Sequence, residues 1–174
     1  MCFKQSSSRR SRAMFAALSV ACLMAGLPVT TWRAQAQDQS AAKPEDVIVA
    51  RKTAMDTLSD RMDQIEQMVS TNKINIKAGQ ELADTVSVLL MAFPHLFPPA
   101  SNQWKAGVDP DPVTGTFASP DVWTRFADFY KRATDASKAA YDISRADKED
   151  DFKKHVQELR TDCNACHAAY LKMQ

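Results

Sequence analysis

Apolar residues recur at intervals of three and four in four stretches of this chain, which is the spacing of one face of an α-helix. The stretches cover residues 45–70, 76–93, 120–145 and 149–172. Glycine is scarce, and six prolines fall in the segment 94–120. Because proline interrupts helices, this segment predicts a long non-helical crossover. We therefore expect an all-α protein, an antiparallel four-helix bundle whose long crossover joins the second and third helices.

The N-terminal part follows a different pattern, that of a secretory signal. A basic start precedes an apolar run over residues 14–27, and an Ala-Gln-Ala sequence ends at Ala36. The apolar run is shorter than the roughly 20 residues that span a bilayer. The alternative is a lipoprotein acylated at Cys22, although Ser19 stands where that signal expects leucine. The predicted organisation is a secretory signal peptide, a flexible leader and one four-helix-bundle domain, over residues 1–36, 37–44 and 45–174.

Removal of the signal changes the charge of the protein. The full chain has 22 basic and 21 acidic residues and a formal net charge of +1. Five of the basic residues and none of the acidic ones lie in residues 1–36, so 17 basic and 21 acidic residues remain, a net charge of −4. A mildly acidic surface argues against nucleic acid or anionic lipid as a partner.

The last predicted helix carries a C-x-x-C-H motif, made by Cys163, Cys166 and His167, which marks covalent attachment of a c-type haem. Thiols three residues apart project from the same side of a helix and can add to the two vinyl groups of one haem. Both cysteines continue the apolar stripe of the helix, so we expect them to face the interior. His167 is then placed to bind the iron as the proximal ligand. The export signal agrees, because this haem is attached outside the bacterial cytoplasm.

Other readings of the two cysteines fit the sequence less well. A redox-active C-x-x-C normally begins a helix after a strand, and no strand pattern precedes Cys163. A zinc site needs further ligands, and the remaining histidines, His95 and His155, do not pair at short spacing. A disulfide between positions i and i+3 of one helix has poor geometry.

The chain from Lys43 to Gln174 resembles the cytochrome c′ family, the class II c-type cytochromes. The resemblance rests on Cys163-x-x-Cys166-His167-x-x-Tyr170, Lys43-Pro44-Glu45-Asp46 with Arg51, the proline-rich crossover, and Ser119-Pro120-Asp121-Val122-Trp123. It implies a four-helix bundle with one haem c on its C-terminal helix. Many members carry a basic residue four positions after the proximal histidine, where this chain has Leu171, followed by Lys172.

The family divides by the sixth coordination position of the iron. Low-spin members, often called cytochrome c-556, fill it with a methionine of the first helix, and high-spin members leave it open and bind small gases there. The matching position, four after Arg51, is Met55, so the resemblance implies Met55 as the distal ligand. Met62 lies about 10 Å further along the same helix, so only one of the two can reach the iron. The alternative is that Met55 fills a gap in the core.

These features predict a periplasmic one-electron carrier, not an enzyme, with His/Met ligation of a covalent haem. A thioether opposite histidine raises the reduction potential of the iron, and constant coordination suits electron transfer. The expected partners are redox proteins of the periplasm or of the inner-membrane electron-transport chain. The alternative is a five-coordinate, high-spin cytochrome c′ that binds nitric oxide or carbon monoxide. Many relatives dimerise through their first two helices, so a homodimer is one expected form of this protein, and the sequence does not decide between it and a monomer.

Further side chains are candidates for the haem pocket. Arg51, one turn before Met55, either meets a haem propionate or lies on a solvated face. Trp123 and Phe126 either wall the haem or pack in the core without touching it. Arg160, one turn before the first cysteine of the motif, is a second candidate partner for a propionate.

Overall fold

The structure, a computed structural model, describes residues 42–172 of the chain. Contacts divide the chain into the units Met1–Asp38 and Gln39–Gln174, and every described residue belongs to the second. The predicted signal peptide over 1–36, the alternative acylation site Cys22 and most of the leader lie outside the described residues, so these remain predictions.

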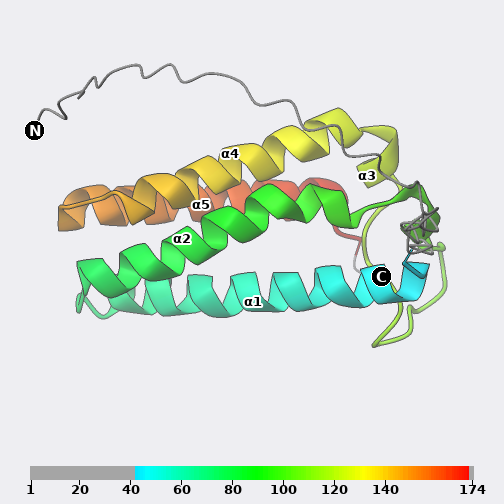
Figure 1. Ribbon diagram of the computed structural model, residues 1–174, viewed down its shortest axis with the longest axis horizontal. Coiled ribbons are helices and arrows are strands. Elements are labelled where there is room, and N and C mark those ends of the chain that lie inside the picture. The colour runs from blue at the N-terminus through cyan, green and yellow to red at the C-terminus, as the bar shows by residue number, and fades with distance from the viewer. Residues whose placement is uncertain (1–41, 173–174) are drawn as a thin grey trace, which may run out of the picture. The chain divides into compact units, whose positions relative to one another are not determined.

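Four long helices make the bundle, and their bounds are α1 Pro44–Ser70, α2 Ile76–Ala92, α4 Phe126–Ser144 and α5 Glu149–Tyr170 (Figure 1). Three of them, all but α4, begin and end within two residues of the bounds that the periodicity predicts. Pro44 stands in the first turn of α1, where Glu45 and Asp46 complement the positive end of the helix. The side chain of Asn75 caps α2 by accepting from a backbone amide. The prediction of an all-α four-helix bundle is confirmed.

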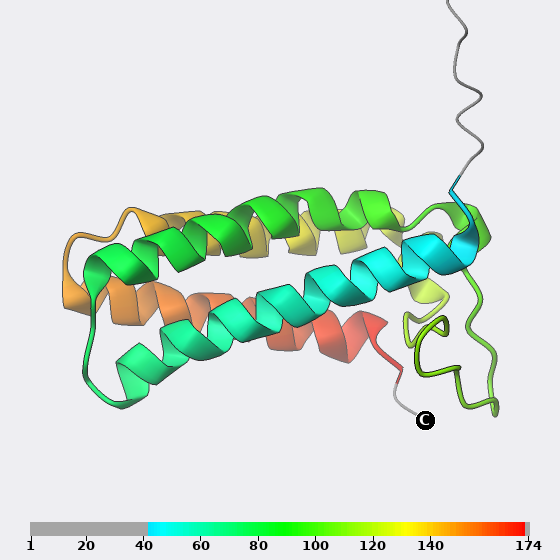
Figure 2. The same cartoon turned by 60° about the horizontal axis from the view of Figure 1, so that its bottom comes forward.

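Neighbouring helices run antiparallel because short turns join them in pairs. Residues 71–75 connect α1 to α2, and residues 145–148 connect α4 to α5 (Figure 2). The long crossover between α2 and α4 is present as predicted, but it is not wholly non-helical. It contains two 3₁₀ helices, η1 Phe93–Leu96 and η2 Pro99–Ser101. Each has a proline in its first turn, where a missing amide hydrogen breaks no helical bond.

The third predicted helix is broken, which corrects the expectation of one continuous helix over 120–145. A short helix α3, Asp121–Thr124, precedes α4, and Arg125 between them leaves the helical conformation with φ −123° and ψ 39°. Val122 is fully buried, and the indole of Trp123 donates to the carbonyl oxygens of Phe97 and Pro98. These contacts tie α3 to the crossover and turn it away from the line of α4. The apolar periodicity continues across the break and therefore conceals it.

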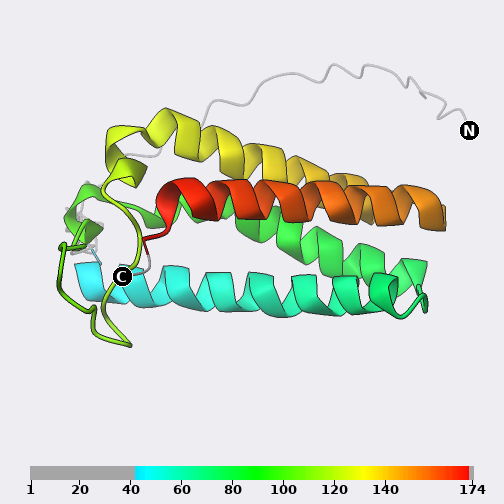
Figure 3. The ribbon, with the colours of Figure 1, turned by 180° about the vertical axis from the view of Figure 1, so that it is seen from behind.

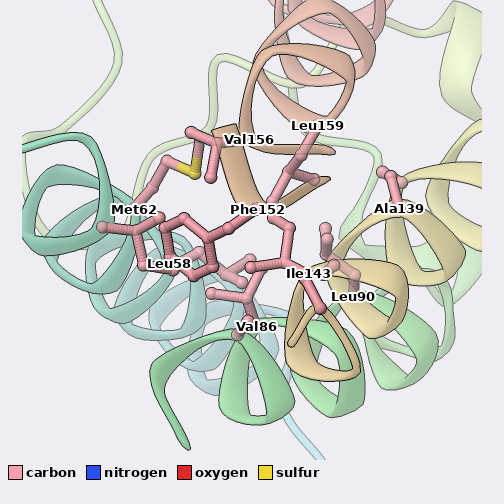
Figure 4. Packing of buried hydrophobic residues seen from close by; sticks show 14 residues of the cluster. Leu58, Met62, Val86, Leu90, Ala139, Ile143, Phe152, Val156 and Leu159 are labelled. Carbon is pink, nitrogen blue, oxygen red and sulfur yellow. The ribbon is translucent and has the colours of Figure 1, made fainter. Parts of the chain in front are cut away.

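All four long helices contribute to the main core. Phe152, Ile143 and Leu159 are fully buried there (Figure 4), and burying each such side chain contributes about 1.5–3 kcal/mol. Small residues let α2 and α4 approach closely, and the hydroxyl of Ser137 donates to the carbonyl oxygen of Ser87 at 2.8 Å. A second, smaller cluster lies toward the crossover and consists of Phe93, Phe97, Val122, Phe129 and Tyr170.

The crossover, the first turns of α1 and the last turn of α5 meet at one end of the bundle (Figure 3). Ala118 and Leu171 form an antiparallel bridge there. The amide of Ser119 donates to the carbonyl oxygen of Tyr170 at 2.8 Å, and the amide of Lys172 donates to that of Phe117 at 2.9 Å. This pairing closes the end of the bundle around the C-x-x-C-H turn. Over residues 42–172, no helix has the length and apolar character needed to cross a membrane.

Candidate functional site

The C-x-x-C-H motif lies in the last two turns of α5, and its side chains gather at one cavity. Cys163 and Cys166 are free thiols, both half-buried, and with His167 they line the same hollow between the helices. Burial raises the pKa of Cys163 and raises that of Cys166 to about 11, so both thiols are protonated at neutral pH. Partial burial lowers the pKa of His167, which favours the neutral imidazole that binds metals.

Two adjoining cavities make up the site. The inner cavity lies between α1, α2, α4 and α5 and has about 660 Å³ of empty space, and the outer cavity opens beneath the crossover with about 810 Å³. Both volumes include space that is open to solvent, and the walls of both cavities are largely apolar, which suits an organic group. Both cavities are lined by the same four side chains, Met55, Phe93, Phe129 and His167.

Met55 and Met62 differ in their surroundings although they share one face of α1. Met55 is half-buried and lines both cavities, as His167 does. Met62 is 4% exposed and belongs to the main core among Leu58 and Val156, as Figure 4 shows. Met62 lines the inner cavity but not the outer one. Met55, and not Met62, therefore lines both cavities, as His167 does.

Arg51 is a buried cation in the wall of the outer cavity. Its guanidinium donates to the hydroxyl of Ser101 at 3.0 Å and to the hydroxyl of Thr116, and it lies 4.6 Å from the ring centroid of Phe97. None of these partners is charged, and burial lowers the pKa of Arg51 to about 10. The alternative of a solvated face for Arg51 is wrong. A fixed cation with neutral partners can receive an anionic group placed in this cavity.

Of the other three candidates for the haem pocket, one is already paired with a carboxylate and two lie outside the cavities. Arg160 lines the inner cavity, but both of its donating nitrogens bind the carboxylate of Glu66, at 2.6 and 2.7 Å. Its guanidinium is thus already paired. Neither Trp123 nor Phe126 lines either cavity. Trp123 packs edge-on against Phe97, which fits its core alternative, and Phe126 is 38% exposed.

The sequence did not single out three residues that the structure brings to the cavities. Phe93 and Phe129 fall within the apolar stripes of residues 76–93 and 120–145, and such a stripe by itself indicates core packing and not a ligand site. Arg132 lines the inner cavity beside Cys166 and pairs with Asp128 at 2.7 Å. The i, i+4 spacing of that pair was a visible signal, but it is also common on solvated helix faces.

The donor set of the site fits a haem better than a bare metal ion. Within residues 42–172 no three His, Cys, Asp or Glu side chains gather as a metal cluster. Iron in a porphyrin needs only axial ligands from the protein, and the imidazole and a thioether border the same cavities. Two free thiols three residues apart, apolar walls and one buried cation match the vinyl groups, the ring and the propionates of haem c.

Comparisons with known proteins agree with this site. The family model described as cytochrome C′ matches residues 46–171. The chain is 34% identical over 98 residues to cytochrome c-556 of Agrobacterium tumefaciens, over 54% of this chain and 70% of that protein.

Among solved structures, cytochrome c′ of Rubrivivax gelatinosus superposes with a TM-score of 0.64 at 23% identity, over 75% of this chain and 98% of that one. Cytochrome c′ of Thermochromatium tepidum gives 0.66 at 20%, over 75% and 97%. A nitric oxide complex of a mutant cytochrome c prime from Alcaligenes xylosoxidans gives 0.64 at 19%, over 76% and 98%. At these identities the structures show the fold alone. The family model covers most of the bundle, including the C-x-x-C-H turn, and this chain therefore belongs to the cytochrome c′ family of haem proteins.

Proposed function

We propose that this protein is an exported one-electron carrier with a single haem c. Cys163 and Cys166 hold the haem by thioether bonds, and His167 and Met55 are the axial ligands of its iron. The observation that carries the proposal is the shared position of the two ligands, because Met55 and His167 both line the inner and the outer cavity. The likeness to a cytochrome c-556 supports the low-spin branch.

The bound haem supplies the redox chemistry, one electron gained or lost at iron. The side chains of this protein would set the reduction potential of the iron. A thioether opposite an imidazole favours the reduced state relative to harder ligands. Phe93 and Phe129 border both cavities and exclude water, which also disfavours the more highly charged ferric state. Arg51 holds a positive charge at the edge of the site, where the propionates would lie.

The site of action follows from the family and the N-terminus. Members of the cytochrome c′ family are periplasmic, and residues 1–36 have the pattern of a secretory signal. The proposed partners are therefore redox proteins of the periplasm or of the inner-membrane electron-transport chain. They exchange electrons with the protein, and no chemical step on a substrate is assigned to it.

The ligand assignment is tested by replacing Met55→Leu in the haem-loaded protein. The substitution keeps the apolar volume and removes the sulfur, so the fold should survive at a cost below about 1.5 kcal/mol. The wild type should be low-spin in its optical spectrum and bind carbon monoxide slowly. The variant should become high-spin, bind carbon monoxide or nitric oxide readily and fall in reduction potential.

Met62→Leu is the matched control, because it makes the same change on the same face of α1. It should leave the spectrum unchanged. A high-spin wild type would contradict the carrier proposal and would favour the five-coordinate, gas-binding alternative. A spectrum that responds to Met62→Leu and not to Met55→Leu would contradict the choice of ligand.

A further inference from the structure

Tyr170 stands three residues after His167, in the last turn of α5, and is 4% exposed. Its hydroxyl donates to a carboxylate oxygen of Asp128 in α4 at 2.5 Å. The same oxygen accepts the Nε–H of Arg132 at 2.7 Å. The ring of Tyr170 packs edge-on against Phe129, with 5.2 Å between the centroids. A hydrogen-bonded chain thus runs from the wall of the inner cavity to the final turn of α5.

The backbone around Tyr170 is also held on both sides. Its carbonyl oxygen accepts the amide of Ser119 from the crossover at 2.8 Å, and the amide of Leu171 donates to the carbonyl oxygen of His167 at 2.9 Å. Helix ends carry unpaired carbonyl groups and fray unless something binds them. The turn that bears His167 is therefore fixed by contacts with α4 and with the crossover.

His167 depends on this turn for its orientation. His167 itself is exposed, in the helix turn that precedes Tyr170. Histidine ligands usually donate their second ring N–H to a neighbour, which sets the plane of the ring. The backbone of the last turn carries the ring and limits the planes that it can take. Asp128 is suited to hold the last turn of α5 in place. Hydrogen bonds from Arg132 and Tyr170 lower the pKa of Asp128 and keep its carboxylate ionised.

We infer that Tyr170 and Asp128 are positioning residues for the proximal ligand, with Arg132 holding the carboxylate in place. The Tyr170–Asp128 hydrogen bond joins α5 to α4 beside the iron site and fixes the plane of the His167 imidazole. The inference rests on the proposed attachment of haem at His167. It does not depend on ligation by Met55, because Met55 takes part in none of these hydrogen bonds.

The test is Tyr170→Phe in the haem-loaded protein, which removes one hydroxyl and keeps the ring. If the ferric iron is low-spin, the plane of the imidazole sets the paramagnetic shifts of the haem methyl groups in NMR spectra. If the reduced iron is five-coordinate, the iron–imidazole stretching band in resonance Raman spectra reports the same bond. Tyr170→Phe should change the order or spread of the methyl resonances in the first case and shift the band in the second.

Three further single variants and one double variant sharpen the result. Asp128→Ala should give the same spectral change, and the double variant should add little to it, because both remove one interaction. Asp128→Asn keeps an acceptor for the hydroxyl and should change less. Tyr141→Phe, on an exposed part of α4 outside both cavities, should change nothing.

The inference is overturned if Tyr170→Phe leaves the spectrum that applies to the wild-type spin state unchanged; a lowered melting temperature alone would show that the hydroxyl serves stability only. Fully additive changes from Tyr170→Phe and Asp128→Ala would also overturn it. Failure of the Met55 assignment would be recognised separately, by a high-spin wild type. The resonance Raman measurement would still test Tyr170 in that case.

Discussion

Arg51 shows how much the meaning of one side chain depends on contacts that are distant in the chain. Its position one turn before Met55 was compatible with a propionate partner and equally with a solvated face. The structure buries it between two hydroxyl-bearing residues, Ser101 and Thr116, that lie 50 and 65 positions further along. A charge that is buried with neutral partners is costly by itself. An anion in the outer cavity would offset that cost.

Arg51→Gln in the haem-loaded protein should lower the reduction potential. The substitution removes a positive charge near the iron, and a nearby cation stabilises the reduced, more electron-rich state. It should also lower the free energy of unfolding by about 1–3 kcal/mol, because buried polar groups lose partners. Spectroelectrochemical titration and denaturant unfolding measure the two effects.

Arg145→Gln is the control for this change. Arg145 is exposed, and its side chain pairs weakly with Asp84 at 3.5 Å, away from both cavities. It should leave the potential unchanged and alter the stability by less than about 1 kcal/mol. An unchanged potential in Arg51→Gln would show that this cation does not act on the haem.

The spacing of apolar residues predicted the helices that pack against the core along their whole length. It missed the break between α3 and α4, which contacts with the crossover produce. The stripes of α1, α2 and α5 face one continuous core, so their bounds follow from the sequence within two residues. The break at Arg125 depends on Val122 and Trp123 meeting the crossover. Those contacts join segments that are distant in sequence. They do not alter the helix propensity of residues 120–126, so the spacing of apolar residues gives no sign of them.

Close approach between α2 and α5 gives a prediction about a single glycine. A Cβ added at Gly79 would lie 2.5 Å from ring atoms of Phe152, which is fully buried. Gly79→Ala should therefore destabilise the fold by about 1–3 kcal/mol through overpacking, although alanine favours helix more than glycine does. Denaturant unfolding measures the loss. Lys77→Ala, at an exposed neighbouring position, should change the stability little, and a gain in Gly79→Ala would contradict the close packing.

For the whole molecule, the fold matters because it brings three distant segments to one end of the bundle. The first turns of α1 supply Arg51 and Met55, the crossover supplies Phe93 and Thr116, and α5 supplies the C-x-x-C-H turn. The other end of the bundle is closed by short turns. A site placed at the end where the long connection lies has room for a large group that the helices alone would not enclose.

Export and loading of the whole protein can be checked by one measurement. The predicted cleavage after Ala36 and the proposed covalent thioethers give an expected intact mass of residues 37–174 plus one haem. The haem should stay with the polypeptide in acid–acetone. Replacing both Cys163 and Cys166 by serine should abolish covalent loading. Complete extraction of the haem would refute the attachment, and a lipid-modified chain beginning at Cys22 would refute the cleavage.

The sequence by itself determined the helical class and the long crossover, and it predicted the chemistry of the C-x-x-C-H motif. Each of these is local, because helical periodicity and the spacing of two thiols with the next histidine are fixed within one or two turns. The resemblance on motif residues added the prediction of Met55 as the distal ligand, which no spacing could separate from Met62.

Only the tertiary structure decided which distant side chains meet. It placed Arg51 against Ser101 and Thr116, joined Tyr170 to Asp128 across 42 positions of sequence, and left Phe126 on the surface. Such pairings depend on the relative rotation and register of whole helices. Those are set by the packing of the entire core, and a stripe of apolar residues shows which face is buried without showing what lies opposite.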